Sequence, residues 1–156
     1  MNYKLRVGSP CIIARYFAFL VPLIFIPHAS ALELSPITYK EALSAYRATG
    51  GLENYRCALL PADKFYAPLE NAEPIAVELD DQLFIKLDGN PMQIGMASAD
   101  EMSSVYSSKD LTVTLIKQWQ SDFSEYHESD NRQVDIAVKA ASEEKTYKAF
   151  GEACGI

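Results

Sequence analysis

The sequence predicts a mainly β protein, a small antiparallel β-barrel or sandwich of seven or eight strands preceded by one helix. Three observations predict this class. Short β-type runs separated by polar turns fill the chain from residue 53 onward, a single amphipathic helical pattern precedes them, and two cysteines lie near the two ends of the β region. We therefore expect one β-domain over 53–156, with residues 32–52 as a helical extension.

Residues 1–31 have the pattern of a secretory signal peptide. Three basic side chains precede an apolar run over 16–26, and Ala29-Ser30-Ala31 supplies the small residues that a signal peptidase accepts. The run is well short of the roughly 20 apolar residues of a membrane span, which disfavours an uncleaved anchor. Cys11 precedes the run, which disfavours a lipoprotein signal. We expect cleavage after Ala31, a periplasmic or secreted location, and no membrane span in the mature chain.

The mature chain is strongly acidic. The whole sequence has 14 basic and 21 acidic side chains, and the predicted signal peptide carries three of the basic ones, which leaves a net charge of −10 over residues 32–156. This charge disfavours nucleic acid and anionic membranes as partners and would steer a cationic partner toward the protein. Many exported proteins are acidic without such a partner, so the charge alone does not identify one.

A helix is predicted over 36–48. Ser35 is the expected N-cap, Pro36 fits the first turn, and Gly50-Gly51 ends the pattern. The apolar residues at positions 39, 42, 43 and 46 share one helical face. Packing of that face against a sheet is the ordinary use of such a helix.

Eight β-type runs follow the helix, with alternation of apolar and polar residues clearest over 134–139. Asp88-Gly89 is a typical hairpin turn between two of them. Two long interruptions, 61–73 and 120–131, are the predicted loops and the places where a binding function is expected. The predicted strands are 54–60, 74–79, 83–87, 92–97, 104–106, 111–119, 133–140 and 146–150.

Two cysteines remain after removal of the signal peptide, Cys57 and Cys154. In an oxidising compartment the simplest prediction is one disulfide between them. Free thiols or a redox pair are the alternatives, although the wide spacing is unlike that of redox motifs. The bridge would tie the first barrel strand to the last, which suits a barrel because these two strands can be neighbours.

The mature sequence offers few residues for catalysis. His127 is its single histidine, so no Ser-His-Asp or Cys-His set is complete without it. The oxygen-rich segments 80–82 and 129–131 lack the spacing of a calcium loop, and there is no phosphate-binding glycine loop. We therefore expect a binding protein rather than an enzyme, without metal or cofactor. An enzyme built around His127 is the third-ranked hypothesis.

The sequence Asn-Tyr-Arg-Cys at 54–57, the Leu-Asp-Gly turn at 87–89 and the segment Met-Ala-Ser-Ala-Asp-Glu-Met-Ser-Ser-Val-Tyr at 96–106 resemble the bacterial inhibitors of C-type lysozyme, the MliC/PliC family. That family has a small disulfide-fastened β-barrel and inserts a serine-rich loop ending in tyrosine into the lysozyme cleft. The resemblance implies a second recognition segment that contains a lysine. The residues that it implicates are Ser98, Ser103, Ser104, Tyr106 and Lys117.

Two functional hypotheses follow. The first is an exported inhibitor that occludes a cell-wall hydrolase, a C-type lysozyme, through the 98–106 loop. The second is a periplasmic toxin-neutralising (immunity) protein or a small-ligand-binding module that uses the 120–131 loop. The expected partner is accordingly a protein, either a basic lysozyme or a toxin.

Overall fold

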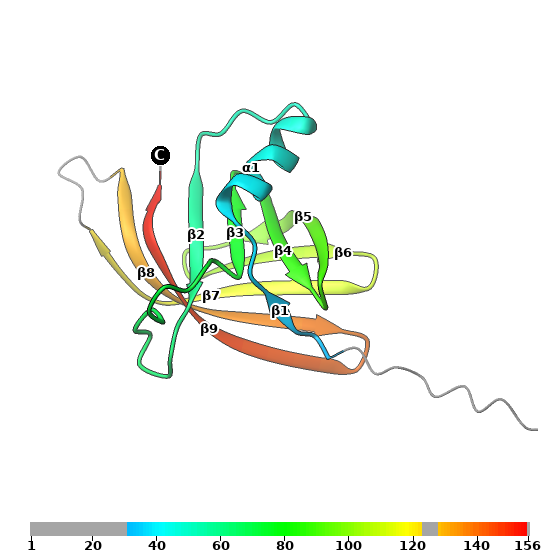
Figure 1. Cartoon of the computed structure of the whole chain (residues 1–156). Coiled ribbons are helices and arrows are strands. Elements are labelled where there is room, and N and C mark those ends of the chain that lie inside the picture. Colours follow the sequence, from blue (N-terminus) through cyan, green and yellow to red (C-terminus); the bar gives the residue numbers. More distant parts are fainter. Residues whose placement is uncertain (1–30, 123–127, 156) are drawn as a thin grey trace, which may run out of the picture.

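The computed structural model describes residues 31–122 and 128–155, and these form a closed antiparallel β-barrel with one short helix (Figure 1). The predicted signal peptide, His127 and the last residue of the chain lie outside the described residues, apart from Ala31. The elements are β1 (Leu34–Ser35), α1 (Tyr39–Ala48), β2 (Arg56–Pro61), β3 (Ala76–Leu79), β4 (Gln82–Leu87), β5 (Asn90–Ala99), β6 (Ser103–Ser108), β7 (Leu111–Asp122), β8 (Ser129–Ala140) and β9 (Glu143–Gly155).

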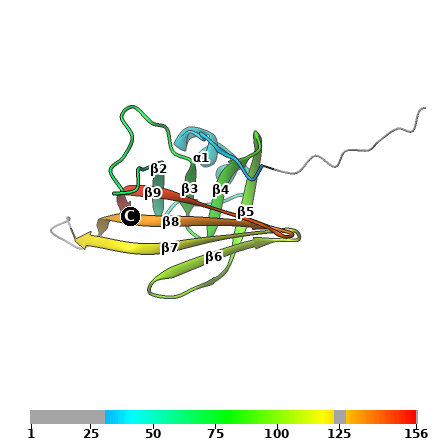
Figure 2. The same ribbon diagram turned by 90° about the horizontal axis from the view of Figure 1, so that it is seen from below.

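The barrel is an up-and-down meander. Each strand from β2 to β9 pairs antiparallel with the next one along the chain, and β9 pairs with β2 to close the cylinder. Figure 2 shows the barrel with α1 on its outer side. The expected class, a mainly β fold with one N-terminal helix, is confirmed, and the architecture is the barrel rather than the sandwich. An eight-stranded barrel leaves an interior just wide enough for side chains or one small ligand.

The β4–β5 hairpin confirms the turn predicted from Asp88-Gly89. Both residues have positive φ, 49° and 79°, as a two-residue type I′ turn requires. Glycine is favoured at the second position because it adopts this backbone region without a Cβ clash.

Helix α1 begins three residues later than predicted. Thr38 is the N-cap: its side chain accepts a hydrogen bond from the Glu41 backbone N–H, and the Glu41 carboxylate accepts one from the Thr38 backbone N–H. This reciprocal capping box satisfies two backbone donors at once. Ser35 instead belongs to β1, so the prediction of Ser35 as N-cap is wrong. The helix ends at Ala48, as expected.

The helix packs on the outer face of the barrel. Its buried residues Ala42 and Tyr46 join a small apolar cluster with side chains from β3 and β4, and the Tyr46 and Phe84 rings meet edge to face at 6.2 Å. The other members of the cluster are Ile37, Val77 and Leu79, with Tyr39 and Leu43 packed at its edge. No helix in the described part of the chain has the length and apolar character needed to cross a membrane.

The last three strands are longer than predicted. β7 continues to Asp122 and β8 begins at Ser129, so both ends of the predicted loop 120–131 are paired strand. The residues of these strand ends, 120–122 and 129–131, are all polar, so the sequence lacks the alternation of apolar and polar residues by which a strand is recognised. The other predicted loop is confirmed: residues 62–75 between β2 and β3 are irregular apart from one bridge, Ala62 to Pro68.

Cys57 on β2 and Cys154 on β9 form a disulfide across the strand pair that closes the barrel. Their Cα atoms lie 4.3 Å apart, and the residues are separated by 97 positions in the sequence. Gly151 makes room for the bridge, since a Cβ there would lie 2.6 Å from the Cys154 sulfur. The predicted pairing of first and last barrel strands is therefore confirmed.

The two ends of the barrel differ. We call the end that carries the β3–β4, β5–β6 and β7–β8 connections the open end, and the opposite end the closed end. At the closed end β1 pairs with β4 beyond the start of β3, and buried Leu32 and Leu34 join the main core. The Tyr147 hydroxyl donates to the Leu32 carbonyl and accepts from the Leu34 N–H. The N-terminal segment thus fills this end with apolar side chains.

Candidate functional site

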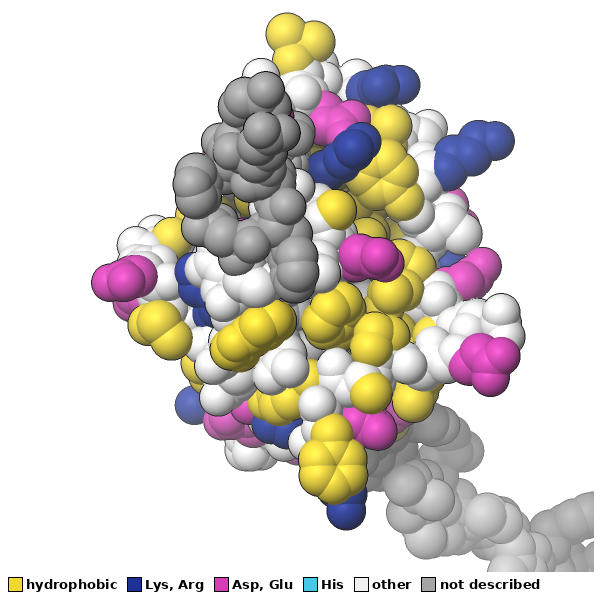
Figure 3. Space-filling model, turned by 90° about the vertical axis from the view of Figure 1, so that its left-hand side faces the viewer, with side chains coloured by type: hydrophobic (Ala, Val, Ile, Leu, Met, Phe, Trp, Pro, Cys, Tyr) yellow, Lys and Arg dark blue, Asp and Glu magenta, His cyan; other side chains and the backbone are white. Residues whose placement is uncertain are grey.

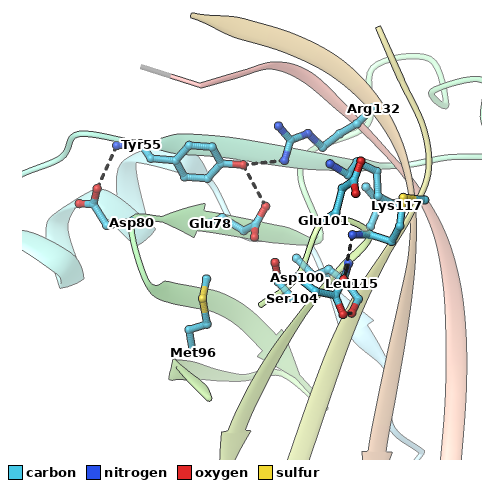
Figure 4. A pocket seen from close by; sticks show the side chains of 13 residues that line it. Tyr55, Glu78, Asp80, Met96, Asp100, Glu101, Ser104, Leu115, Lys117 and Arg132 are labelled. Carbon is cyan, nitrogen blue, oxygen red and sulfur yellow. Dashed lines mark hydrogen bonds between the residues drawn. The ribbon is translucent and has the colours of Figure 1, made fainter. Parts of the chain in front are cut away.

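A cavity of about 310 Å³ opens at the open end of the barrel. Figure 4 shows side chains from β3, β5, β6, β7 and β8, and from the segments that connect strands, around this cavity. Its wall is mixed, with both charged and apolar side chains. The lining residues are Tyr55, Glu78, Asp80, Met96, Asp100, Glu101, Met102, Ser103, Ser104, Leu115, Lys117, Arg132 and Val134.

Glu78 lies inside the barrel because of its position in β3. Val77 and Leu79 point outward beneath α1, so the alternation of the strand directs Ala76 and Glu78 into the interior. Glu78 is only 5% exposed. A carboxylate with so little solvent must be compensated by hydrogen bonds or by a charged partner.

Two tyrosines donate to this carboxylate. The Tyr106 hydroxyl lies 2.5 Å from Oε1 of Glu78, and the Tyr55 hydroxyl lies 3.4 Å from Oε2. The Tyr55 hydroxyl in turn accepts a hydrogen bond of 2.9 Å from Nη1 of Arg132 (Figure 4). Arg132 is therefore linked to Glu78 through the neutral hydroxyl of Tyr55.

Arg132 is itself held by Asp130, another buried carboxylate. The guanidinium makes two parallel hydrogen bonds, Nε to Oδ1 and Nη2 to Oδ2, both of 2.7 Å. Gln120 on β7 also donates to Oδ2 of Asp130. Such a bidentate pair is well compensated and geometrically fixed. The chain of contacts thus runs from Asp130 through Arg132 and Tyr55 to Glu78.

Burial governs the proton affinities of this network. Loss of solvent raises the pKa of Glu78, against the lowering effect of the Tyr106 hydrogen bond and the Arg132 charge. Burial and the adjacent Glu78 carboxylate raise the pKa of both Tyr55 and Tyr106, so these hydroxyls stay protonated and remain donors. For Arg132 burial lowers the pKa, but the hydrogen bonds that it donates to Asp130 and the nearby negative charges outweigh this effect, and the net shift is upward.

The β5–β6 turn at the edge of the cavity is organised by Asp100. Its carboxylate accepts from the backbone N–H groups of Met102 and Ser103 at 2.8 and 2.7 Å, and from the Ser103 hydroxyl at 3.0 Å. The two backbone bonds are the main reason that the pKa of Asp100 is lowered. The Lys117 N–H donates to the Met102 carbonyl at 2.8 Å, which joins the turn to β7.

The structure brings together some of the residues implicated by the family resemblance. Ser103, Ser104 and Lys117 are half-buried and line the same cavity. Ser98 is exposed on β5 and is not among the lining residues. The expectation that 98–106 forms a loop is wrong, because only 100–102 lie outside strands β5 and β6.

Tyr106 needs a separate correction. Its side chain is fully buried in the main core and donates to Glu78 from inside the barrel. It therefore does not lie on an exposed loop, as the resemblance implied. Because residues alternate along a strand, Ser104 and Tyr106 share the inner face of β6. The role that the structure supports for Tyr106 is to hold Glu78.

Sequence reasoning missed the residues that form the cavity network: Tyr55, Glu78, Asp130 and Arg132. One signal was present in the run Ala-Val-Glu-Leu at 76–79, where an acid stands among residues typical of a buried strand. Asp130 lies in the predicted loop 120–131 and Arg132 directly before the predicted strand 133–140, so the sequence pattern places neither residue on a strand face.

Exposed apolar side chains lie next to the β5–β6 turn. Met102 and Trp119 are about half exposed, and Ile116 pairs with Ser103 across β6 and β7. Figure 3 shows one side of the molecule, with hydrophobic and acidic side chains intermingled on it. Large apolar groups beside a polar pocket are typical of protein-binding surfaces.

No protein-family model, curated protein or solved structure matches the chain. Within 31–122 and 128–155, no three histidine, cysteine, aspartate or glutamate side chains are grouped as metal ligands. The arrangement of side chains at the open end is thus the basis for a functional assignment.

Proposed function

We propose that this protein is an exported inhibitor that docks its open end into the substrate cleft of a cell-wall hydrolase of the C-type lysozyme class. The observation that supports this best is the meeting of two recognition segments that are separate in the sequence. Ser103 on β6 pairs with Ile116 on β7, and Lys117 hydrogen-bonds to the turn that precedes Ser103. Both segments can therefore contact one cleft.

The β5–β6 turn is suited to insertion because it is preorganised. Asp100 fixes the backbone of Met102 and Ser103, so little conformational entropy is lost on binding. The exposed side chains of Met102 and Trp119 supply apolar contact area beside the polar turn. In this proposal Tyr106 holds Glu78 inside the barrel and does not contact the partner.

Charge favours the same class of partner. The mature chain carries a net charge of −10, so a basic hydrolase would be attracted at low ionic strength. The predicted signal peptide and the Cys57–Cys154 disulfide are in keeping with export to an oxidising compartment. Occlusion of a cleft needs no catalytic residue on the inhibitor.

The test is lysis of a peptidoglycan substrate by a C-type lysozyme in the presence of purified residues 32–156. Micromolar protein is expected to slow lysis, and the double variant Ser103→Ala/Lys117→Ala is expected to weaken inhibition about tenfold or more, the loss of two contacts at the centre of an interface. Both wild type and variant are compared at two salt concentrations, because inhibition is expected to weaken as salt screens the charge.

A matched control comes from the other end of the same strand. Ser108→Ala/Lys109→Ala removes the same two side-chain types from exposed positions at the closed end. It is expected to inhibit as the wild type does. Absence of inhibition by micromolar wild-type protein would refute the proposal, and equal weakening by both double variants would refute the assignment of the open end.

A further inference from the structure

The cavity at the open end lies behind the β5–β6 turn and is a candidate binding site in its own right. Its volume of about 310 Å³ falls at the lower end of the range for small-molecule pockets, roughly 300–1,000 Å³. The mouths of β-barrels are common places for such pockets. The question is therefore which chemistry the lining residues would recognise.

Glu78 retains unused acceptor capacity on the cavity side. An ionised carboxylate offers about four acceptor positions. Oε1 receives one close hydrogen bond from Tyr106, whereas Oε2 receives only the 3.4 Å contact from Tyr55. Because Glu78 lines the cavity and is 5% exposed, a donor placed in the cavity would compensate a carboxylate that has lost its water.

The charges around Glu78 favour a cation as that donor. Asp100 and Glu101 stand on the β5–β6 turn, and Asp80 lies on the opposite side of the opening. The cations are fewer: Arg132 is paired with Asp130, and Lys117 donates to Gln120. Four acids and two bases line the cavity, so a positive ligand is favoured over a negative one.

Part of the remaining wall is apolar, beside the hydroxyl groups of Tyr55, Ser103 and Ser104. Met96, Leu115 and Val134 come from β5, β7 and β8 and face the cavity beside Glu78. These side chains can contact a short hydrocarbon chain but cannot hydrogen-bond to a sugar or a peptide group along its length. A ligand that combines one cationic donor group with a short alkyl portion matches both parts of the wall.

We propose that the open-end cavity binds a small primary alkylammonium ligand, with its NH₃⁺ group against Oε2 of Glu78 and its alkyl chain against Met96, Leu115 and Val134. This inference stands apart from the proposed inhibition, since the ligand contacts that it names, Glu78 and the apolar wall, lie inside the barrel. The protein would then carry a small-molecule site beneath its protein-binding edge.

The experiment is an NMR titration of ¹⁵N-labelled residues 32–156 with n-pentylamine at constant pH and ionic strength. A ligand of this size is expected to bind with a Kd on the order of 1 mM. Saturable shifts are expected for amides around Glu78, Met96 and Val134. Pentanoate and 1-pentanol, which have similar length but no positive charge, are expected to cause no saturable shift at these residues.

Two variants and a charge control assign the binding to this cavity. Glu78→Gln keeps an acceptor for Tyr106 but removes the charge, and should weaken pentylamine binding about tenfold. Met96→Phe, which fills the space and leaves Glu78 in place, should abolish it even if the glutamine variant does not fold. Glu143→Gln changes the net charge equally at the closed end and should bind as the wild type does. No saturable shift with pentylamine, or equal shifts with pentanoate, would overturn the proposal, as would undiminished binding by the Met96→Phe variant.

Discussion

The open and closed ends of this barrel are built from the same strands but differ in chemistry. At the closed end, Leu32, Leu34 and Leu111 fill the interior, and the N-terminal strand β1 lies beside β4. At the open end, Glu78 and Arg132 occupy interior positions and a cavity remains. Apolar side chains therefore fill one end of the cylinder, whereas the other end retains buried polar groups, whose burial costs free energy unless hydrogen bonds compensate it.

Two tyrosines illustrate the chemical difference between the two ends of the barrel. Tyr147 at the closed end bonds to backbone groups of Leu32 and Leu34, so it fastens the segment that fills the interior. Tyr106 toward the open end is buried as well, but its hydroxyl donates to the carboxylate of Glu78. The first contact stabilises a neutral backbone, and the second stabilises a buried acid. Changes at the two ends should therefore have different consequences.

The largest expected effect comes from the disulfide, which fastens β2 to β9 near the open end. The double variant Cys57→Ala/Cys154→Ala should lose about 4 kcal/mol of unfolding free energy, since the bridge closes a long loop in the unfolded chain. Urea denaturation of the variant and of oxidised wild type measures this. Reduction of the wild type with dithiothreitol should produce a similar loss. Unchanged stability in both cases would show that closure of the barrel depends on its hydrogen-bonded strands alone.

The second prediction concerns packing at the closed end. Leu34→Ala should cost about 2–4 kcal/mol, because the side chain is buried in the main core and its removal leaves a void between β1 and β4. Met102→Ala at the open end, a change of similar size at a half-exposed position, should stay within about 0.5 kcal/mol. Thermal or urea unfolding gives both values. A loss in the Met102 variant as large as that in the Leu34 variant would contradict the difference between the ends.

The two tyrosines provide the third prediction. Tyr106→Phe should cost about 2 kcal/mol, because it leaves a buried carboxylate without its close donor. Tyr147→Phe removes the same hydroxyl from uncharged backbone partners, and should cost about 1 kcal/mol, since a neutral group left without its partner is less costly than a charged one. Chemical denaturation of both variants at neutral pH tests this order. The reverse order would mean that Glu78 does not depend on Tyr106.

The sequence allowed the fold to be predicted further than the site. Two of the signals are local sequence patterns, the alternation over 134–139 and the Asp88-Gly89 turn. The disulfide follows from the number of cysteines that remain after the predicted signal peptide. Each of the three led to the correct element. The helix start was misplaced because Ser35 and Thr38 are both good N-caps, and only pairing of Ser35 with Lys86 decides between them. Such a contact joins residues far apart in the chain.

The site was predicted only in part for the same reason. Ser103 and Lys117 were recognised through the resemblance, but their meeting depends on the β6–β7 register. Tyr106 has the same sequence pattern whether it faces the core or a partner, and only closure of the barrel directs it inward. Glu78 and Arg132 interact through Tyr55, across three strands or their flanking segments. No local pattern in the sequence encodes that contact.

The smallest expected effect is a pH dependence that is specific to the open end. Burial raises the pKa of Glu78 above its ordinary value of 4.5, so the folded state holds this proton at pH values where the unfolded chain has lost it. The contribution of Glu78 to the free energy of unfolding is therefore complete below about pH 4.5 and is lost as pH rises through the raised pKa of this carboxyl group. The neighbouring hydroxyls of Tyr55 and Tyr106 stay protonated throughout this range.

Glu78→Gln isolates this contribution because glutamine imitates the protonated acid. The difference in unfolding free energy, wild type minus variant, should fall as pH rises from 4 to 8, by about 1.4 kcal/mol for each unit by which the pKa is raised. Urea denaturation across this range measures the difference, and groups that titrate alike in both proteins cancel from it. Glu143→Gln at the exposed start of β9 should show a flat difference. If the Glu78 difference is flat or rises with pH, then Tyr106 and Arg132 compensate the carboxylate fully, and the open end is as well satisfied as the closed one.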